Sequence, residues 1–216
     1  MSFTPSLLPK LIETVTETII KNAGEITALD QAIGDGDHVT NLQRGLTALM
    51  AQRSEISQLD WPAAWQKIGM TVMTSVGGAS GSLYGTLFVA MSKSAAGKDL
   101  NVQSVAEAFA QAVEAVKHRG KSDVGEKTML DVLVPVAKHL QDAAAVSLPL
   151  SALLEQTKQV AITGMESTRD MLATKGRASF LGERTRGHID AGAMSSQLVI
   201  CALVDVLLAN LTAPAQ

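Results

Sequence analysis

The stretch Leu29-Asp-Gln-Ala-Ile-Gly-Asp-Gly-Asp-His-Val-Thr-Asn41 places three carboxylates, Asp30, Asp35 and Asp37, within eight residues and separates them by glycines. A segment with apolar residues at helical spacing precedes this stretch, and a second one follows it. We therefore predict an acidic, glycine-rich connection between two helices. The stretch sets the boundary between these helices and is the strongest indication of function in the sequence.

The composition predicts an all-α protein and excludes several classes of function. Hydrophobic residues make up 46% of the 216 residues and aromatic ones only 3%, so the core must consist of Leu, Ala, Val, Ile and Met, which favour helices. The net charge of −3, without a basic stripe, argues against nucleic acid as a partner. The single cysteine, Cys201, fits a reducing, cytoplasmic environment. We expect neither a signal peptide nor a membrane span.

Apolar periodicity predicts eight helices in a single domain that spans residues 1–216. Candidate helix boundaries are an N-cap at Asp37, an N-cap at Asp60 and a stop at Gly24, whereas Pro135 should kink its helix or shift its start. The predicted helices cover residues 6–23, 38–53, 60–75, 80–95, 102–116, 127–144, 149–173 and 192–211.

Antiparallel neighbours would bring every second loop to the same end of the helical domain. Those loops are 25–37, 75–81, 119–126 and 174–191, and their surroundings hold twelve of the 17 glycines. The loops at the opposite end are ordinary caps and turns. We therefore predict the functional site at the glycine-rich end.

The three aspartates predict a site for a hard divalent cation. Asp35 and Asp37 are two residues apart and point the same way in an extended loop, and Asp30 can close on the same point. Their mutual repulsion is relieved by a cation such as Mg²⁺, shared with substrate phosphates. An EF-hand is excluded, because Val39 and Leu46 occupy liganding positions. The alternative is one N-cap aspartate and two solvated turn residues.

Two predicted helix starts are suited to bind an anion. His38, Thr40 and Asn41 lie in the first turn of one helix, where backbone N–H groups and the helix dipole favour negative charge. The segment 77–81 opens another helix with three glycines and Ser80, although it lacks the lysine of a Walker A loop. The alternatives are a surface histidine and close helix packing through small residues.

The basic loop 174–188 could hold phosphates at the same end of the domain. Arg177, between Gly176 and Ala178, is the candidate catalytic residue, together with Asp35 and Asp37. The alternative for the other charged residues of this loop is that they are simply exposed to solvent. Met129 could line an apolar slot for a base, although core packing is its commoner role.

The motifs together resemble one family. Asp30-x4-Asp35-Gly-Asp37-His38, Ser75-Val-Gly-Gly-Ala-Ser-Gly81, Arg119-Gly-Lys121, Gly125-Glu-Lys-Thr-Met129 and Lys175-Gly-Arg-Ala-Ser-Phe-Leu-Gly-Glu-Arg184 are similar to motifs of the nucleotide-binding L subunit of dihydroxyacetone (glycerone) kinase. They follow the family order and span nearly the whole chain.

The resemblance implies an eight-helix closed barrel that binds ADP or ATP with two Mg²⁺ ions on Asp30, Asp35 and Asp37. It also implies a set of nucleotide-binding residues. These are His38, Val39, Thr40, Asn41, Ala79, Ser80, Gly120, Met129, Arg177, Ile189, Asp190 and Ala191.

The resemblance further implies that the chain donates phosphate to a ketose held on a separate K subunit. A free-standing L chain favours the phosphoenolpyruvate-dependent phosphotransferase-system type, in which an M subunit rephosphorylates retained ADP; a homodimer is left open. Val39, Ser82 and Ala191 replace a glycine and two prolines of the family pattern. The alternatives are an ATP-dependent kinase subunit for another ketose or tetrose, a non-catalytic ADP-sensing regulator and a Mg²⁺-dependent phosphatase.

Overall fold

The computed structural model describes residues 4–212, which form nine α-helices and three short 3-10 helices and contain no strand. The elements are η1 (Pro5–Leu7), α1 (Leu8–Lys21), α2 (Ala23–Ile33), α3 (His38–Ile56), α4 (Trp61–Ser75), α5 (Gly78–Ala95), α6 (Val102–Gly120), α7 (Leu130–Ala145), α8 (Leu150–Ser167), η2 (Thr168–Asp170), η3 (Arg177–Thr185) and α9 (Ala191–Thr212).

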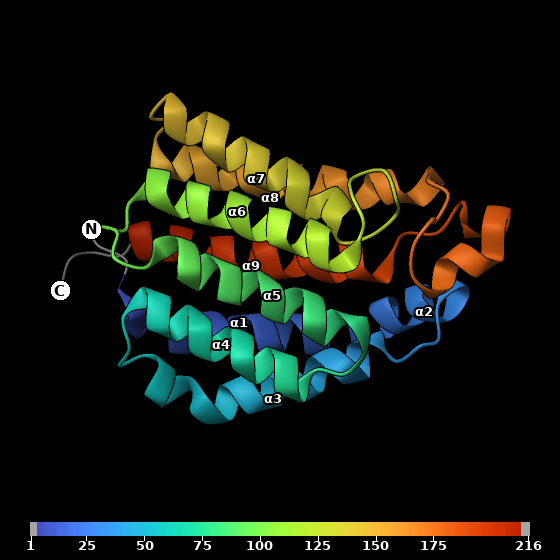
Figure 1. Ribbon diagram of the computed structural model, residues 1–216, viewed down its shortest axis with the longest axis horizontal. Helices are drawn as coiled ribbons and strands as arrows, with labels where there is room; N and C mark the ends of the chain where they lie inside the picture. The colour runs from blue at the N-terminus through green and yellow to red at the C-terminus, as the bar shows by residue number, and fades with distance from the viewer. Residues whose placement is uncertain (1–3, 213–216) are drawn as a thin grey trace.

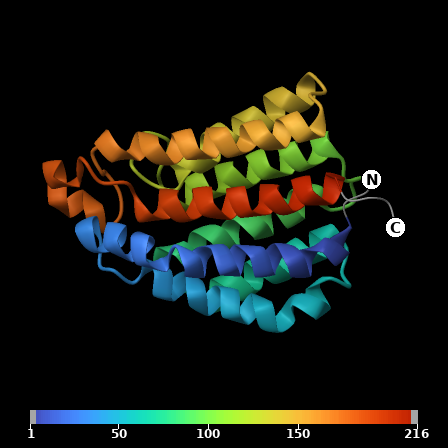
Figure 2. The ribbon, with the colours of Figure 1, turned by 180° about the vertical axis from the view of Figure 1, so that it is seen from behind.

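The eight long helices form a closed ring. Helix α1 packs on α3, each helix from α3 onward packs on the next, and α9 packs on α1. The ring is antiparallel, and α9 lies between α8 and α1 when the molecule is seen from behind (Figures 1 and 2). The predicted all-α, eight-helix barrel is therefore confirmed, and α2 is an additional helix at one end of it.

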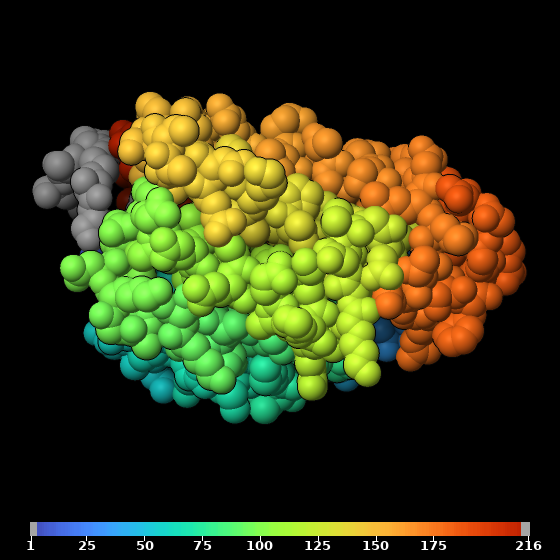
Figure 3. Space-filling view, turned by 45° about the horizontal axis from the view of Figure 1, so that its top comes forward, coloured from blue at the N-terminus to red at the C-terminus, as the bar shows by residue number. Residues whose placement is uncertain are grey.

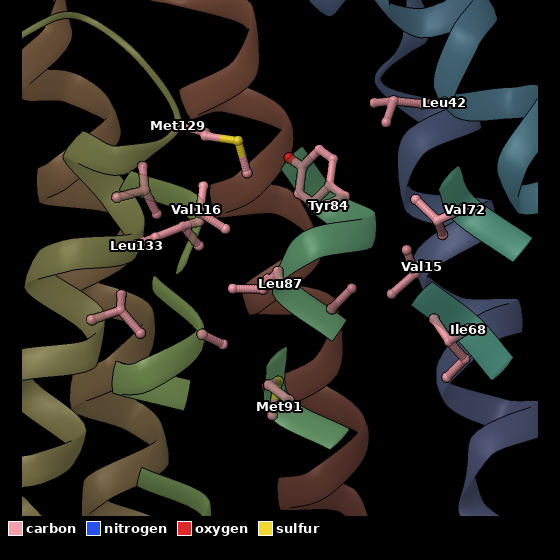
Figure 4. Close-up of a cluster of buried hydrophobic side chains, with 14 of the residues drawn as sticks. Val15, Leu42, Ile68, Val72, Tyr84, Leu87, Met91, Val116, Met129 and Leu133 are labelled. Carbon is pink, nitrogen blue, oxygen red and sulfur yellow. The ribbon is translucent and has the colours of Figure 1, made fainter. Parts of the chain in front are cut away.

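The core fills the ring with aliphatic and sulfur-containing side chains. Tyr84 and Leu87 of α5 face Val116 of α6 and Leu133 of α7, with Met129 above them (Figure 4). Helices α1, α3 and α4 contribute a second group of side chains. Each buried aliphatic side chain contributes about 1.5–3 kcal/mol relative to its exposed state, so the ring holds the loop ends in place.

Helix α9 is the one described helix that is long and apolar enough, by length and composition alone, to cross a membrane. Half of its apolar window is buried against the rest of the protein, where α9 contacts α1, α2, α7 and α8. These are also the properties of the core helix of a globular protein.

Several predicted boundaries at the glycine-rich end are wrong. Residues 23–33 form helix α2, so the predicted loop 25–37 shortens to four residues. Gly24 lies inside α2 and stops nothing; α1 already ends at Lys21. Helix α8 ends at Ser167 instead of residue 173, and half of the predicted loop 174–191 is the 3-10 helix η3.

The cap predictions have mixed outcomes. The Asp60 side chain accepts a hydrogen bond from the Ala63 N–H, as predicted for an N-cap. The Asp37 side chain caps nothing, although Asp37 does precede α3. Pro135 lies inside α7, which begins at Leu130 instead of 127.

Candidate active site

The candidate site lies at one end of the ring, on the right in Figure 1, where α2, η3 and the loops before α3, α5, α7 and α9 meet. The space-filling view shows the η3 segment (orange) beside the 121–129 loop (yellow-green) at this end (Figure 3). Thr174 and Lys175 join the two segments through the Glu126 carboxylate, at 3.0 and 3.4 Å. The glycine-rich loops are therefore brought together as the sequence predicted.

The carboxylates of Asp30, Asp35 and Asp37 converge at this end. Each offers one oxygen, and the three oxygens lie within 4.8 Å of one another. A Cβ atom at Gly34 would lie 2.2 Å from Asp30 Oδ1, so only glycine permits this approach. Gly36 has φ +77°, a conformation that favours glycine in the turn between the other two carboxylates.

Asp30 owes its position to α2, the helix that the sequence analysis missed. The carbonyl oxygen of Asp30 accepts the Gly34 N–H at 2.5 Å, which ends the helix. The Asp30 carboxylate accepts the His38 N–H at 3.0 Å, so Asp30, and not Asp37, satisfies the start of α3. Asp35 and Asp37 are thereby left exposed beside it.

Arg177, the first residue of η3, extends across the loops to the triad. Its guanidinium lies 2.8 Å from Asp35 Oδ2, although 72% of the Arg177 side chain is exposed. The cluster of three carboxylates thus already attracts one cation of this chain. An exposed pair of this kind contributes little to stability, at most about 1 kcal/mol.

His38 is buried and joins three helices. Its Nδ1 lies 3.0 Å from the Ser80 hydroxyl on α5, and its Nε2 lies 2.9 Å from the Ser195 hydroxyl on α9. Burial lowers the pKa of the His38 imidazole, which outweighs the opposing effect of Asp30 and the other two carboxylates. Because the His38 side chain is buried, the surface-histidine alternative is wrong, and the imidazole connects α3 to α5 and α9.

The start of α5 is open to an anion. Among residues 4–212 no side chain caps it, and its N-cap residue is Gly77. A Cβ atom at Gly77 would lie 2.7 Å from the Asn41 Oδ1 atom, so the glycine allows Asn41 to pack against the loop. Gly78 has φ +65° and turns the chain into the helix. The first N–H groups of α5, with Ala79 and Ser80, are thereby presented at the site.

Lys127 holds the loops behind the site, a role that the sequence analysis missed. It is 1% exposed with φ +61°, and its ammonium donates to the carbonyl oxygens of Thr168 (2.5 Å), Arg169 (3.4 Å) and His188. Burial lowers the pKa of the Lys127 ammonium. The sequence placed Lys127 in a predicted helix; only the tertiary structure reveals the three carbonyls.

Asp190 precedes α9 and caps it. Its carboxylate accepts the Ala193 N–H at 2.7 Å, and its own N–H donates to the Thr168 hydroxyl at 3.1 Å. Removal of the carboxyl group from water raises its pKa to about 6. The nearby Lys127 ammonium opposes this rise without cancelling it.

The raised pKa of Asp190 predicts a pH-dependent contribution to stability. Because the folded-state pKa exceeds the unfolded value, the stabilisation is full below pH about 4 and is lost as the pH rises through about 6, up to about 3 kcal/mol in all. In Asp190→Asn, which can keep the cap, this contribution is absent. The wild-type-minus-variant difference in the free energy of unfolding, measured in urea between pH 4 and 7, should fall with pH. A constant difference would contradict the assignment.

The other predicted site residues fall into two groups. Thr40 and Ala79 are exposed, and Gly120 is partly buried at the end of α6. Four residues are buried in the core: Val39, Met129, Ile189 and Ala191. Met129 packs in the core, the commoner role for a methionine, and its backbone N and Cβ atoms would lie 3.7 and 3.8 Å from a Cβ atom at Gly192.

Sequence comparisons place the chain among known kinase subunits. The DAK2 domain family matches residues 32–205. The chain is 40% identical, over 87% of its length and 89% of the relative, to the ADP-binding subunit DhaL of PEP-dependent dihydroxyacetone kinase 1 from Listeria innocua. It is 40% identical to the corresponding Escherichia coli subunit, with 79% of this chain and 81% of that one covered.

The fold agrees with solved kinase structures. The dihydroxyacetone kinase of C. freundii in complex with AMP-PNP and Mg²⁺ matches 92% of this chain with a TM-score of 0.69 and 25% identity, and the native form matches with a TM-score of 0.72. This chain spans about a third of that kinase chain (33%). The matched length and the identity to the bacterial subunits establish that the chain belongs to the DAK2 domain family.

Proposed function

We propose that this chain is the ADP-binding, phosphoryl-donating subunit of a PEP-dependent dihydroxyacetone kinase. The observation that carries the proposal is the convergence of three carboxylates beside Arg177 and the open start of α5. The relatives named as ADP-binding subunits of such kinases support the same function. The K subunit would hold the ketose, an M subunit would restore the phosphate, and the complex would work in the cytoplasm.

The carboxylate cluster suits Mg²⁺. Its donors are all oxygen atoms, which Mg²⁺ prefers, and Gly34 makes room for the Asp30 carboxylate. The ion pair of the Arg177 guanidinium with Asp35 indicates that the cluster attracts cations. Asp30, Asp35 and Asp37 would hold two Mg²⁺ ions. When bound, these ions would neutralise the negative charge of the phosphate oxygens.

The nucleotide would lie across the starts of α3, α5 and α9. Backbone N–H groups of residues 38–41 and of Ala79 and Ser80 would donate to phosphate oxygens. Residues 189–191 and Gly120 would line the nucleoside side, over the buried Met129. Arg177 would move from Asp35 to the transferring phosphoryl group and stabilise its charge there.

Reconstitution tests the proposal. The chain is mixed with a K subunit, a phosphocarrier donor system and dihydroxyacetone, and the ketose phosphate is measured. Catalysed formation of the ketose phosphate is expected. A chain that binds ADP but yields no ketose phosphate would instead be an ADP-sensing regulator, and release of free phosphate without an acceptor would indicate a phosphatase. Replacement of the donor system by ATP distinguishes the ATP-dependent alternative.

Arg177→Met should slow phosphoryl transfer by about 10²–10³-fold, because one preorganised cation is removed from the transition state. Stability should be unchanged, since the side chain is mostly exposed. The measurement is the transfer rate in the reconstituted system. The matched control is Arg184→Met, in the same 3-10 helix and exposed, where the rate should stay within about twofold. Equal losses in both variants would contradict a specific role for Arg177.

A further inference from the structure

A buried group of hydroxyls lies directly behind the proposed phosphate site. Ser195 and Ser196 of α9 are 0% and 1% exposed, and the Tyr84 hydroxyl of α5 lies 3.1 and 2.8 Å from their Oγ atoms. His38 joins this group to Ser80, with its two ring nitrogens facing one hydroxyl each. The path from Ser195 to Ser80 therefore runs through a single imidazole.

The number of hydroxyl protons and free acceptors around Ser195 determines which group donates in each hydrogen bond. The Ser195 hydroxyl has one proton and three neighbours: His38 Nε2 at 2.9 Å, Tyr84 at 3.1 Å and the Gly192 carbonyl at 3.1 Å. The Gly192 carbonyl already accepts the Ser196 hydroxyl at 2.8 Å and, by helical geometry, the Ser196 N–H, which occupy both of its lone pairs.

Tyr84 and Ser196 form a hydrogen bond with each other. Because the Ser196 hydroxyl donates its proton to the Gly192 carbonyl, the Ser196 oxygen is left to accept the Tyr84 hydroxyl proton at 2.8 Å. The nearest acceptor for the Ser195 proton is then His38 Nε2.

This direction decides what Ser80 presents to a ligand. An imidazole whose Nε2 accepts a hydrogen bond carries its proton on Nδ1, which then donates to Ser80 Oγ at 3.0 Å. The Ser80 proton is then directed to the open start of α5, where a phosphate oxygen can accept it. In the other tautomer Ser80 would donate to His38 and present only lone pairs, which repel an anion.

We propose that Ser195 is a positioning residue of the phosphate site: by donating to His38 Nε2 it fixes the imidazole tautomer, which turns the Ser80 proton towards a phosphate oxygen of the nucleotide. The proposal rests on the proposed nucleotide-binding function. Ser195 is fully buried and acts only through His38 and Ser80.

Nitrogen-15 NMR of the imidazoles and ADP titration with Mg²⁺ test this proposal. In the wild type, the His38 signal, identified by its absence in His38→Gln, should show the proton on Nδ1. Ser195→Ala should shift the signal towards the Nε2–H form and weaken ADP binding by about 2–10-fold, the equivalent of one neutral hydrogen bond. Adenosine, which lacks phosphate, should bind both proteins equally.

Ser92→Ala is the matched control, because it also removes one buried serine hydroxyl, on α5, outside the group around His38. It should leave the His38 tautomer and the ADP affinity unchanged, since twelve residues of helix, about 18 Å, separate Ser92 from Ser80. An Nε2–H tautomer in the wild type, or equal weakening of ADP binding in both serine variants, would overturn the proposal. A wild type that binds no ADP would overturn the proposed function as well, so the two failures are distinct.

Discussion

A chain that carries both Asp35→Asn and Asp37→Asn is expected to lose Mg²⁺-dependent ADP binding and phosphoryl transfer. Asn removes the negative charge at two of the three converging carboxylates and leaves Asp30 alone to hold the metal. Mg²⁺ keeps its waters unless carboxylates and phosphates replace them. We expect ADP affinity to fall by at least about 100-fold, or roughly 3 kcal/mol, in calorimetric titrations with Mg²⁺.

The same variant should fold at least as well as the wild type in the absence of metal. Its substitutions relieve repulsion between carboxylates, and the pair of Asp35 with Arg177 that they remove is exposed. Asp123→Asn is the matched control, since it neutralises an exposed carboxylate at the same end, outside the triad. A double variant that still transfers phosphate with its K subunit would show that the metal assignment is wrong.

Lys127→Met is expected to be the most destabilising of the substitutions considered. Met keeps the apolar stem but removes the ammonium that donates to the carbonyl oxygens of Thr168, Arg169 and His188. The Thr168 and Arg169 carbonyls keep a backbone donor each, the N–H groups of Met171 and Gly187. A hydrogen bond from a charged donor contributes about 1.5–3 kcal/mol, and the desolvation of the charge that is no longer buried offsets part of the loss. We expect a net loss of about 3 kcal/mol and a thermal midpoint lower by roughly 6–12 °C.

Lys138→Met on α7 is the control for this substitution. Its ammonium pairs with Asp142 at 2.6 Å, but the Lys138 side chain is 75% exposed, so the loss should stay below about 0.5 kcal/mol. Similar losses for both lysines would contradict the role of Lys127. Because Lys127 also fixes the loops that carry Arg177 and Asp190, its replacement should weaken ADP binding as well.

The sequence alone predicted the ring helices and the end of the molecule that carries the site. The periodicity of apolar residues sufficed for most of the long helices, because they bury one face, and the long apolar run sufficed for α9. Helix α2 was missed because only Ile26 and Ile33 are buried on it and Gly24 suggested a stop. Their spacing of seven residues, with Leu29 between them, was the available signal.

Residue types in the sequence predicted which side chains form the candidate site. They did not predict the hydrogen bonds that hold these side chains in place. The acidic triad and Arg177 stand out as charges beside glycines, and the structure brings Arg177 to Asp35. Lys127, Ser195 and Tyr84 carry no such signal: their partners lie 41 to 157 residues away in the sequence, and the contacts exist only after the ring closes. Hydrogen bonds of that range follow from packing and not from local pattern.

We propose that this chain retains ADP through Mg²⁺ held on Asp30, Asp35 and Asp37. Native mass spectrometry of the purified protein, supplied with Mg²⁺ and ADP and then treated with a chelator, tests this retention. We predict one ADP with two Mg²⁺ ions per chain before chelation and loss of both afterwards. Retention of ADP after removal of the metal, or no ADP on the chain when both are in excess, would contradict the claim.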